Sequence, residues 1–364
     1  ITVTLNGKDY TAMLDASGSW SVGVPAADVG ALVNGDQTIS ATLTDKAGNS
    51  TTATHEFDVS LTAPVVAINT LAADDVINAT EKGQDLQVSG TSNQPEGTAI
   101  TVSLNGINYT ATTDASGNWS VTVPAANVSA LGEANYTVTA NVTDSVGNSA
   151  STSHDVLVDS SLPVVTIDTL AGDNIVNAAE VAAGQTLTGK VTNAAPGDTV
   201  TISLGGQTFT ATVQDDLTWS LPLTQSQLTA LGNGDLTVSA SVTNAHGNSA
   251  SAGREYSVDA TAPTVTIDTV AGDNVINASE AAAGVAISGT TTAEAGQTVT
   301  VTLNGKTYQT TVQADGTWQL IVPAADVGAL NDGIVTVTAT VSDVAGNSSS
   351  ADRVGLVDAT VPQV

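Results

Sequence analysis

Cysteine is absent from this chain of 364 residues. Its absence excludes disulfide cross-links and thiolate metal sites, although it leaves the cellular compartment open. Basic residues are scarce as well, because 7 Lys and Arg stand against 36 Asp and Glu, for a formal net charge of −29. Such an acidic surface repels nucleic-acid phosphates and anionic lipids and attracts cations. We therefore expect no nucleic-acid partner and no insertion into a membrane.

Long hydrophobic runs and surface aromatics are also in short supply. No stretch reaches the length of a transmembrane helix, and no signal peptide opens the sequence, so any export signal is expected outside this segment. Aromatic residues make up only 3% of the chain, which leaves few for an exposed binding platform. The hydrophobic content of 41%, with alternating Val, Thr and Ile, indicates a folded β-rich chain rather than an acidic disordered tail.

The sequence contains little evidence of a catalytic site. The chain has three histidines, His55, His154 and His246, and no repeated Ser–His pair accompanies them. We interpret His55 and His154 as solvated strand residues rather than catalytic groups. The sequence therefore predicts that the protein is not an enzyme.

Regular repetition is the strongest positive signal. Trp20, Trp119, Trp219 and Trp318 are 99, 100 and 99 residues apart, and a proline follows each of them by 44 residues, at Pro64, Pro163, Pro263 and Pro362. This spacing predicts one truncated unit and three complete ones, which we call repeats 1 to 4: residues 1–62, 63–161, 162–261 and 262–360. Repeat 1 lacks the residues that would form its first strands, so we expect it to be the least stable.

Each complete repeat reads as about seven short strands. In repeat 4 the alternating segments are 264–269, 285–291, 298–305, 306–313, 317–323, 334–343 and 348–358, with a hairpin at Asn304-Gly305. Short helices are expected at 324–330 and 277–283. The pattern predicts an all-β chain of tandem seven-stranded immunoglobulin-like sandwiches joined end to end as an extended rod.

Strand alternation predicts the core. Trp318, Leu320 and Val322 share one face, as do their counterparts in repeats 2 and 3. We favour buried tryptophans over sugar-stacking platforms because their same-face neighbours are apolar. Tyr10, Tyr109, Phe209 and Tyr308 share a second register and are also expected in the core.

A polar decapeptide occurs three times, as AADDVINATE at 72–81, AGDNIVNAAE at 171–180 and AGDNVINASE at 271–280. Its Asp, Asn and Glu residues, with others near the linkers, supply hard oxygen ligands without His or Cys, which suits Ca²⁺ rather than Zn²⁺. The candidate ligands are Asp58, Asn69, Asp74, Asp75, Asn78, Glu81, Asp159, Asp168, Asp173, Asn174, Asn177, Glu180, Asp259, Asp268, Asp273, Asn274, Asn277 and Glu280.

Two groupings of these residues are expected at the linkers. One joins repeats 2 and 3 through Asp159, Asp168, Asp173, Asn174 and Glu180, and the other joins repeats 3 and 4 through Asp259, Asp268, Asp273, Asn274 and Glu280. The junction of repeats 1 and 2 departs from this pattern, because Ser60 and Asn69 replace two aspartates and only Asp58 offers a substitute. The alternative is that Asn277 and Glu280 form a helix capping box while Asp273 and Asn274 shape a turn. Both interpretations can hold for Asn277 and Glu280.

The segments YTATTDASGNWSVTVPAANVSAL (109–131) and YTVTANVTDSVGNSASTSHDVLVD (136–159) resemble the tandem bacterial immunoglobulin-like repeats of giant type I-secreted adhesins and biofilm-associated proteins. The resemblance extends over every repeat. It implies a calcium-rigidified stalk, secreted and displayed on the surface of a Gram-negative cell as a monomeric rod. Host-cell or biofilm surfaces would be bound by other parts of the parent protein. In the alternative, the repeats themselves bind host glycans or self-associate; their near-identity favours the spacer.

Overall fold

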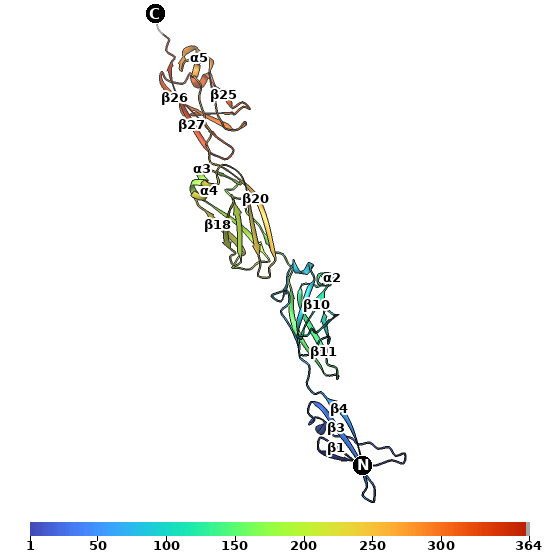
Figure 1. Cartoon of the computed structure of the whole chain (residues 1–364). Helices are drawn as coiled ribbons and strands as arrows, with labels where there is room; N and C mark the ends of the chain where they lie inside the picture. Colours follow the sequence, from blue (N-terminus) through green and yellow to red (C-terminus); the bar gives the residue numbers. More distant parts are fainter. Residues whose placement is uncertain (362–364) are drawn as a thin grey trace. The chain divides into compact units, whose positions relative to one another are not determined.

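The computed structural model describes residues 1–361, so Pro362, the last proline of the series, lies outside the described residues. The chain divides into two compact units, one ending at Ser161 and the other beginning at Leu162. The first unit contains repeats 1 and 2, and the second contains repeats 3 and 4 (Figure 1).

Repeat 2 is a sandwich of two sheets with strand orders β10-β7-β5 and β6-β12-β11-β8-β9. Its first strand is divided between the sheets, because β5 pairs antiparallel with β7 whereas β6 pairs parallel with β12. Counting this divided strand once gives the seven expected. The elements are β5 (Val66–Ile68), β6 (Val76–Ile77), η1 (Glu81–Gly83), β7 (Leu86–Ser92), β8 (Ala99–Leu104), β9 (Ile107–Thr112), β10 (Asn118–Val123), α2 (Ala125–Ser129), β11 (Ala134–Thr143) and β12 (Ser149–Val158).

Repeat 3 has the same plan, with sheets β13-β15-β18 and β14-β20-β19-β16-β17. Figure 1 places its two helices, α3 and α4, together at one end of the sandwich. Its elements are β13 (Val164–Val165), β14 (Ile175–Asn177), α3 (Ala178–Ala183), β15 (Gln185–Thr192), β16 (Thr199–Leu204), β17 (Gln207–Thr212), β18 (Thr218–Leu223), α4 (Gln225–Leu231), β19 (Gly234–Thr243) and β20 (Ser249–Asp259).

Repeat 4 repeats this arrangement in the sheets β22-β25 and β21-β27-β26-β23-β24. A single bridge between Val265 and Thr291 stands where the earlier repeats have the first half of their divided strand. Its elements are η2 (Val270–Gly272), β21 (Val275–Asn277), α5 (Ala278–Ala283), β22 (Val285–Thr290), β23 (Thr298–Leu303), β24 (Lys306–Thr311), β25 (Thr317–Val322), α6 (Ala324–Val327), β26 (Gly333–Ser342) and β27 (Ser348–Asp358).

Repeat 1 contains one sheet, in the order β2-β1-β3-β4, within residues 1–62. Its elements are β1 (Thr2–Leu5), β2 (Lys8–Thr11), α1 (Ala26–Val29), β3 (Gly35–Thr44) and β4 (Ser50–Val59). The residues around Trp20 form no strand, and the side chain is 42% exposed. The missing second sheet therefore uncovers the residue that the other repeats bury.

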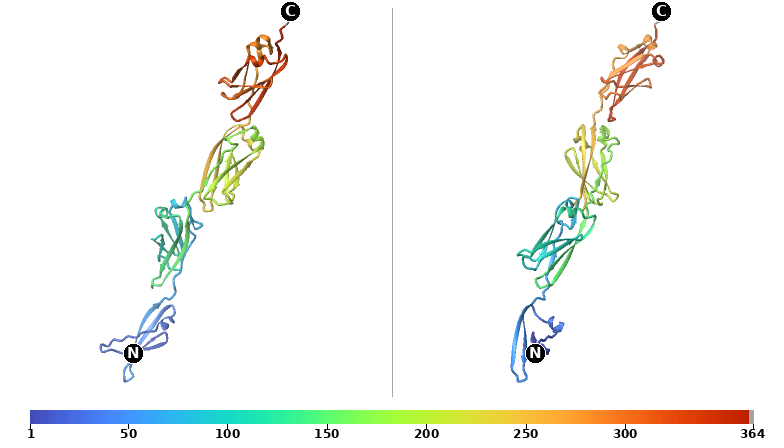
Figure 2. Two further views of the ribbon diagram at one scale, coloured as in Figure 1. Left: turned by 180° about the vertical axis from the view of Figure 1, so that it is seen from behind. Right: turned by 90° about the vertical axis from the view of Figure 1, so that its right-hand side faces the viewer.

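The all-β prediction is confirmed, as is the predicted hairpin at Asn304-Gly305. Asn304 and Gly305 adopt φ values of 49° and 75°, the left-handed pair that a two-residue hairpin requires. The strands β6, β14 and β21 were not predicted, because they lie inside the polar decapeptide and are only two or three residues long. In both views of Figure 2 each complete repeat shows its sheets as separate layers.

The predicted tryptophan core is confirmed in repeats 2 to 4, where Trp119, Trp219 and Trp318 are at most 2% exposed. Buried indoles cannot serve as sugar-stacking platforms. The second aromatic register lies at the margin of the core rather than inside it, since Tyr109, Phe209 and Tyr308 are only half-buried. The reason is chemical for Tyr308, whose hydroxyl donates to Asp326 Oδ2 at 2.9 Å on helix α6.

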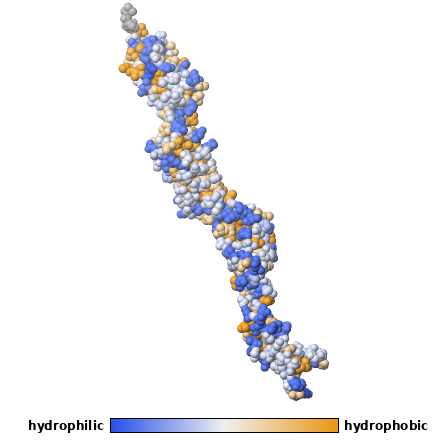
Figure 3. Space-filling view, viewed as in Figure 1, coloured by the Kyte–Doolittle hydropathy of each residue, from blue (hydrophilic) through white to orange (hydrophobic). Residues whose placement is uncertain are grey.

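The visible surface in Figure 3 is mostly hydrophilic or neutral, with scattered hydrophobic residues. Within residues 1–361, no helix is both long and apolar enough to cross a membrane.

A strand glycine makes room for each buried tryptophan. A Cβ added at Gly189 would lie 1.9 Å from Thr166 O and 2.7 Å from the Trp219 ring, and the Trp219 Nε1–H donates to the same Thr166 oxygen at 3.2 Å. Gly253, on β20 of the same repeat, leaves 3.8 Å to its nearest neighbour. The two glycines thus form a matched pair in one sandwich.

We expect Gly189→Ala to lower the free energy of unfolding of repeat 3 by about 1–3 kcal/mol, the usual cost of overpacking a core. Gly253→Ala should change it by less than about 0.5 kcal/mol, because the added methyl meets only ordinary contacts. Hydrogen–deuterium exchange of peptides from 185–223 measures both effects locally. Equal protection in the two variants would contradict the proposed role of Gly189.

Candidate metal and joint sites at the ends of the repeats

The first half of the decapeptide forms a strained turn that its own Asn closes. In repeat 4, Asn274 Oδ1 accepts a hydrogen bond from Val270 N at 3.1 Å, and Asn274 N donates to Val270 O at 2.7 Å. Ala271, Gly272 and Asn274 all have positive φ, of 54°, 86° and 64°. Asn174 closes the same turn in repeat 3, and Asp75 does so in repeat 2. These three candidate ligands therefore have a structural role as turn formers.

A cationic or imidazole side chain from the last strand supports this region in each complete repeat. His154 Nε2 lies 2.7 Å from Asp75 Oδ1, and Arg254 Nε donates to Asn174 Oδ1 at 3.1 Å. Arg353 instead donates to Ile267 O, at 2.8 Å from Nε. His154 is thus a strand residue, as predicted, but its side chain is only 29% exposed and its ring contacts the decapeptide.

The pKa of the Asp75 carboxyl lies below its usual range, chiefly because the Leu71 N–H donates to it and secondarily because of His154.

The second half of the decapeptide forms a short strand and a capped helix. Asn177 Oδ1 accepts from Glu180 N at 3.0 Å, while Glu180 Oε2 accepts from Asn177 N at 2.9 Å. Asn277 and Glu280 cap α5 in the same way, and Asn78 and Glu81 exchange equivalent bonds at η1. The capping-box alternative is confirmed, and it leaves the proposed calcium role of these residues untested.

The pairing of strand β14 determines at which end of repeat 3 the decapeptide finishes. This strand runs parallel to β20, and Asn177 lies opposite Asp259, the last residue of β20. Parallel neighbours run towards the same end of a sheet, so Asn177 and Glu180 lie at the end of repeat 3 that leads to repeat 4. In repeat 2, Asp159 N likewise donates to Ile77 O at 3.1 Å, beside Asn78.

The predicted grouping at the junction of repeats 3 and 4 is therefore wrong, whereas the grouping at the junction of repeats 2 and 3 stays a prediction. Asp259 lies with Asn177 of its own repeat, whereas Asn277 lies opposite Asp358 at the far end of β27. An eleven-residue strand such as β27 spans about 35 Å at about 3.3 Å per residue. The sequence pattern missed the short parallel strand, and with it the direction in which the decapeptide runs.

The described contacts of the other candidate ligands lie within their own repeats. Asp168 and Asp268 accept from the hydroxyls of Thr188 and Ser288 at 2.8 and 2.7 Å. The remaining residues make turn or strand contacts: Asp173 with Ile175 N, Asp273 with Val275 N, Asp74 with Val76 N, Asn69 with Ser89, and Asp58 opposite Asp36 in the strand register.

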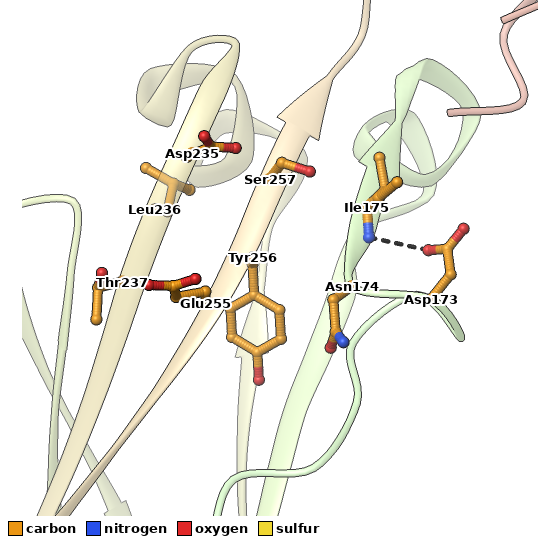
Figure 4. A pocket seen from close by; sticks show the side chains of 9 residues that line it. All are labelled: Asp173, Asn174, Ile175, Asp235, Leu236, Thr237, Glu255, Tyr256 and Ser257. Atoms are coloured by element: carbon orange, nitrogen blue, oxygen red, sulfur yellow. Dashed lines mark hydrogen bonds between the residues drawn. The ribbon is translucent and has the colours of Figure 1, made fainter. Parts of the chain in front are cut away.

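A shallow depression of about 400 Å³ on repeat 3 gathers carboxylates from three strands or strand ends. Figure 4 shows Asp235 and Glu255 on two strands and the Asp173 carboxylate turned toward Ile175 N. In the part of the chain described, no three His, Asp or Glu side chains form a group able to hold a metal. The acidic residues share regions of the surface without forming a carboxylate cluster.

The joint between repeats 3 and 4 is closed by a residue outside the predicted set. Asn347 Nδ2 donates to Asp259 O at 2.8 Å, and Asn347 Oδ1 accepts from Ala178 N at 2.7 Å. Ala178 is the first residue of α3, so this bond satisfies an N–H that has no partner within the helix. Asn347 is 5% exposed. One amide side chain thus hydrogen-bonds to two backbone groups of the preceding repeat.

The turn 343–347 holds this amide in place. Asp343 Oδ1 accepts from Asn347 N at 2.8 Å, and Asp343 Oδ2 accepts from Asn347 Nδ2 at 3.0 Å. Repeat 2 has the same arrangement, in which Asn148 Nδ2 donates to Asp144 Oδ2 at 2.8 Å and to Ser60 O at 3.0 Å. The recurring words TDKAGN, TDSVGN and SDVAGN mark these turns in the sequence, but the words alone do not show that the Asn contacts the preceding repeat.

Comparison with known proteins identifies the family. Residues 69–160 and 268–358 match the family described as bacterial Ig-like domain, and residues 117–221 match bacterial Ig-like domain (group 3). Together, residues 69–160 and 268–358 cover half of the chain. No curated protein matches the sequence.

Among solved structures, one described as a Ca²⁺-stabilized adhesin that helps an Antarctic bacterium bind ice is 35% identical, with 98% of this chain and 89% of that chain covered and a TM-score of 0.43. A second, from work on host cell surface retention of a 1.5-MDa bacterial ice-binding adhesin, is 32% identical over 82% of this chain and 99% of that one, with a TM-score of 0.40. A single bacterial immunoglobulin-like domain of the M. primoryensis ice-binding adhesin is 45% identical over 27% of this chain and 100% of its own, with a TM-score of 0.23. With its periodic tryptophans, divided first strands and matching sequence, the chain belongs to the bacterial immunoglobulin-like domain family, as a tandem of the repeats found in large adhesins.

Proposed function

We propose that this chain is an extended spacer in a large bacterial cell-surface adhesin, secreted and displayed outside the cell. The observation that carries the proposal is the joint at Asn347, which couples one repeat directly to the next. Each complete repeat also has its own apolar core, so it can fold as one segment of a longer series. We propose 1–62, 63–161, 162–261 and 262–360 as the repeat boundaries, and surfaces of host cells or biofilms as partners of other parts of the parent protein.

We also propose that the chain has no enzymatic activity and that it is monomeric. Membership of the bacterial Ig-like domain family, together with similarity to adhesin structures, supports the absence of enzymatic activity. A net charge of −29 supports the monomeric state, because copies of the chain repel one another.

Calcium is the proposed stiffening ligand at the end of repeat 3. Asn177, Glu180 and Asp259 lie at that end and supply the oxygen donors that Ca²⁺ prefers. Since residues 1–361 hold no group of three carboxylates or imidazoles, backbone carbonyls and water would have to complete the coordination. Extracellular calcium modules commonly bind at about 10⁻⁴–10⁻³ M, and a bound ion would offset the repulsion among nearby carboxylates.

Glu180→Gln with Asp259→Asn separates calcium binding from capping. The chain already uses glutamine as a capping partner, where Gln227 Oε1 accepts from Thr224 N at 2.8 Å. We expect the double variant to keep its fold and to lose the calcium response of this joint. Because the chain has no cysteine, Thr212→Cys and Thr311→Cys allow one spin label on each of repeats 3 and 4.

In the labelled full chain, Ca²⁺ should narrow the distribution of distances between the labels, and a chelator should broaden it. The double variant should show the broader distribution under both conditions. If it narrows with Ca²⁺ as the parent does, Glu180 and Asp259 serve only as structural residues.

Asn347→Ala should loosen the same joint without metal. It removes two bonds to repeat 3 and leaves Asp259 O and Ala178 N without these partners, a loss of about 1–3 kcal/mol of coupling. The spin-label distances should broaden in calcium-free buffer. Asn49→Ala is the control for the cost of the turn alone, because Asn49 makes the equivalent bonds to Asp45 within its own turn. Unchanged distances in the Asn347 variant would refute the coupling.

The turn of repeat 2 should respond to acid. The Asn148 side chain, with nearby backbone N–H groups, lowers the pKa of Asp144 below 3.8. A depressed carboxyl pKa contributes stability above the unfolded value, and this contribution is lost as the pH falls through the folded value. We therefore expect the Asn148 side-chain amide signals in NMR spectra to titrate below pH 3.8.

Asp144→Asn is the matched control. Repeat 3 has Asn244 at this position, and its Oδ1 accepts from Asn248 N at 3.0 Å without a titrating group. The variant should keep the turn at neutral pH and lose the acid response of the Asn148 amide. An unaltered titration in the variant would assign the response to another group.

A further inference from the structure

Repeat 4 exposes an apolar patch on the outer face of its larger sheet. Ile334 is 78% exposed, Val354 is 60% exposed and Leu356 is 41% exposed. Ile334 lies directly opposite Leu356 between β26 and β27, and Val354 lies opposite Thr336 one step along the same face. Half-buried Val275 on β21 is paired with Leu356 on its other side. These four apolar side chains form one continuous surface, which we call the aliphatic face.

The other repeats carry polar groups at these places, except for Leu157 in repeat 2. The positions of Ile334, Val354 and Leu356 correspond to Asp36, Glu56 and Asp58 in repeat 1, to Asn135, Asp155 and Leu157 in repeat 2, and to Asp235, Glu255 and Ser257 in repeat 3. Figure 4 shows the three residues of repeat 3 around the shallow depression of that sheet. In repeats 1 and 3 the strand pair therefore forms without apolar residues there, so the folding of repeat 4 does not explain its three apolar residues.

Carboxylates bracket the aliphatic face. Outward-facing residues of β27 alternate with buried ones, so Asp352, Val354, Leu356 and Asp358 follow one another on the same face. Asp352 Oδ1 accepts from Thr338 Oγ1 at 2.6 Å, which holds one carboxylate beside the patch. A second copy of the chain would bring like charges together at both ends, in addition to the repulsion of its net charge. A partner with cationic ends would meet complementary charge.

We propose that the aliphatic face of repeat 4 is a docking surface for a protein segment that presents branched aliphatic side chains flanked by Lys or Arg. Its apolar centre would cover Ile334, Val354 and Leu356, and its cations would lie against Asp352 and Asp358. Exposed apolar surface rimmed by polar groups is the usual form of such a contact. This inference does not depend on calcium or on the joints between repeats.

The probe is a synthetic peptide of alternating Val and Thr with two Lys at each end. Two further peptides serve as controls: one keeps the Lys residues and replaces Val with Ser, and the other keeps Val and replaces Lys with Glu. The full chain is tested as it stands and as the variant Ile334→Asp, Val354→Glu, Leu356→Ser, which copies repeat 3. Circular dichroism checks that the triple variant keeps the β-sheet content of the parent chain.

We expect the Lys-flanked Val peptide to bind the parent chain and to bind the triple variant at least tenfold more weakly. The variant adds two carboxylates, so purely electrostatic binding would become tighter rather than weaker, and the direction of the change separates the two causes. The reciprocal variant Asp235→Ile, Glu255→Val, Ser257→Leu should create a second site on repeat 3.

Three results would overturn the proposal: no binding to the parent, equal or tighter binding to the triple variant, or equal binding of the Ser peptide. Dimerisation of the parent that the triple variant abolishes, measured by sedimentation, would assign the face to a second copy instead.

Discussion

The parallel pairing of the divided first strand with the last strand organises each complete repeat. In repeat 3 it sets Asn177 opposite Asp259, so the chain that enters at one end of the sandwich delivers its decapeptide to the other. The capped helix α3 then begins where the repeat ends. Only because of this pairing does the N-terminal part of a repeat take part in the joint with the next one. A polar segment that looks like a linker is therefore part of the sheet edge.

Closing the joint then requires only one amide from the following repeat. An amide carries both a donor and an acceptor, and Asn347 uses them on Asp259 O and Ala178 N. A carboxylate in its place could only accept, and an aliphatic residue could do neither. The Asp343 carboxylate accepts from both the backbone and the side chain of Asn347, so the amide is oriented before the neighbouring repeat meets it. Such preorganisation reduces the entropy lost when the joint forms.

The sequence was sufficient for features that depend on local pattern. Alternation predicted the strands and the buried Trp318, and Asn304-Gly305 predicted a hairpin that the positive φ values confirm. The capping alternative was likewise available, because Asn177 and Glu180 stand three residues apart. The long-range pairing of β14 with β20 could not be predicted from the sequence. Strand β14 is three residues long, too short for a period to be recognised, and its partner lies about eighty residues away. Without that pairing the acids were assigned to the wrong ends of the repeats. The role of His154 was missed for the same reason, since Asp75 is 79 residues away.

Repetition also makes the exceptions informative. Where the repeats agree, as at the tryptophans and the Asn of each turn, the shared residue serves the fold or the joint. Where one repeat departs at several neighbouring positions at once, a common cause is needed, since independent changes at exposed sites have little effect on stability. Repeat 4 departs in this way at Ile334, Val354 and Leu356, of which Ile334 is distant from the other two in the sequence and lies beside them in the sheet. Only the strand register brings the three changes together. Repeats 1 and 3 carry acidic residues at these positions, whereas repeat 4 carries aliphatic residues. Repeat 4 therefore has an apolar surface that the other repeats lack.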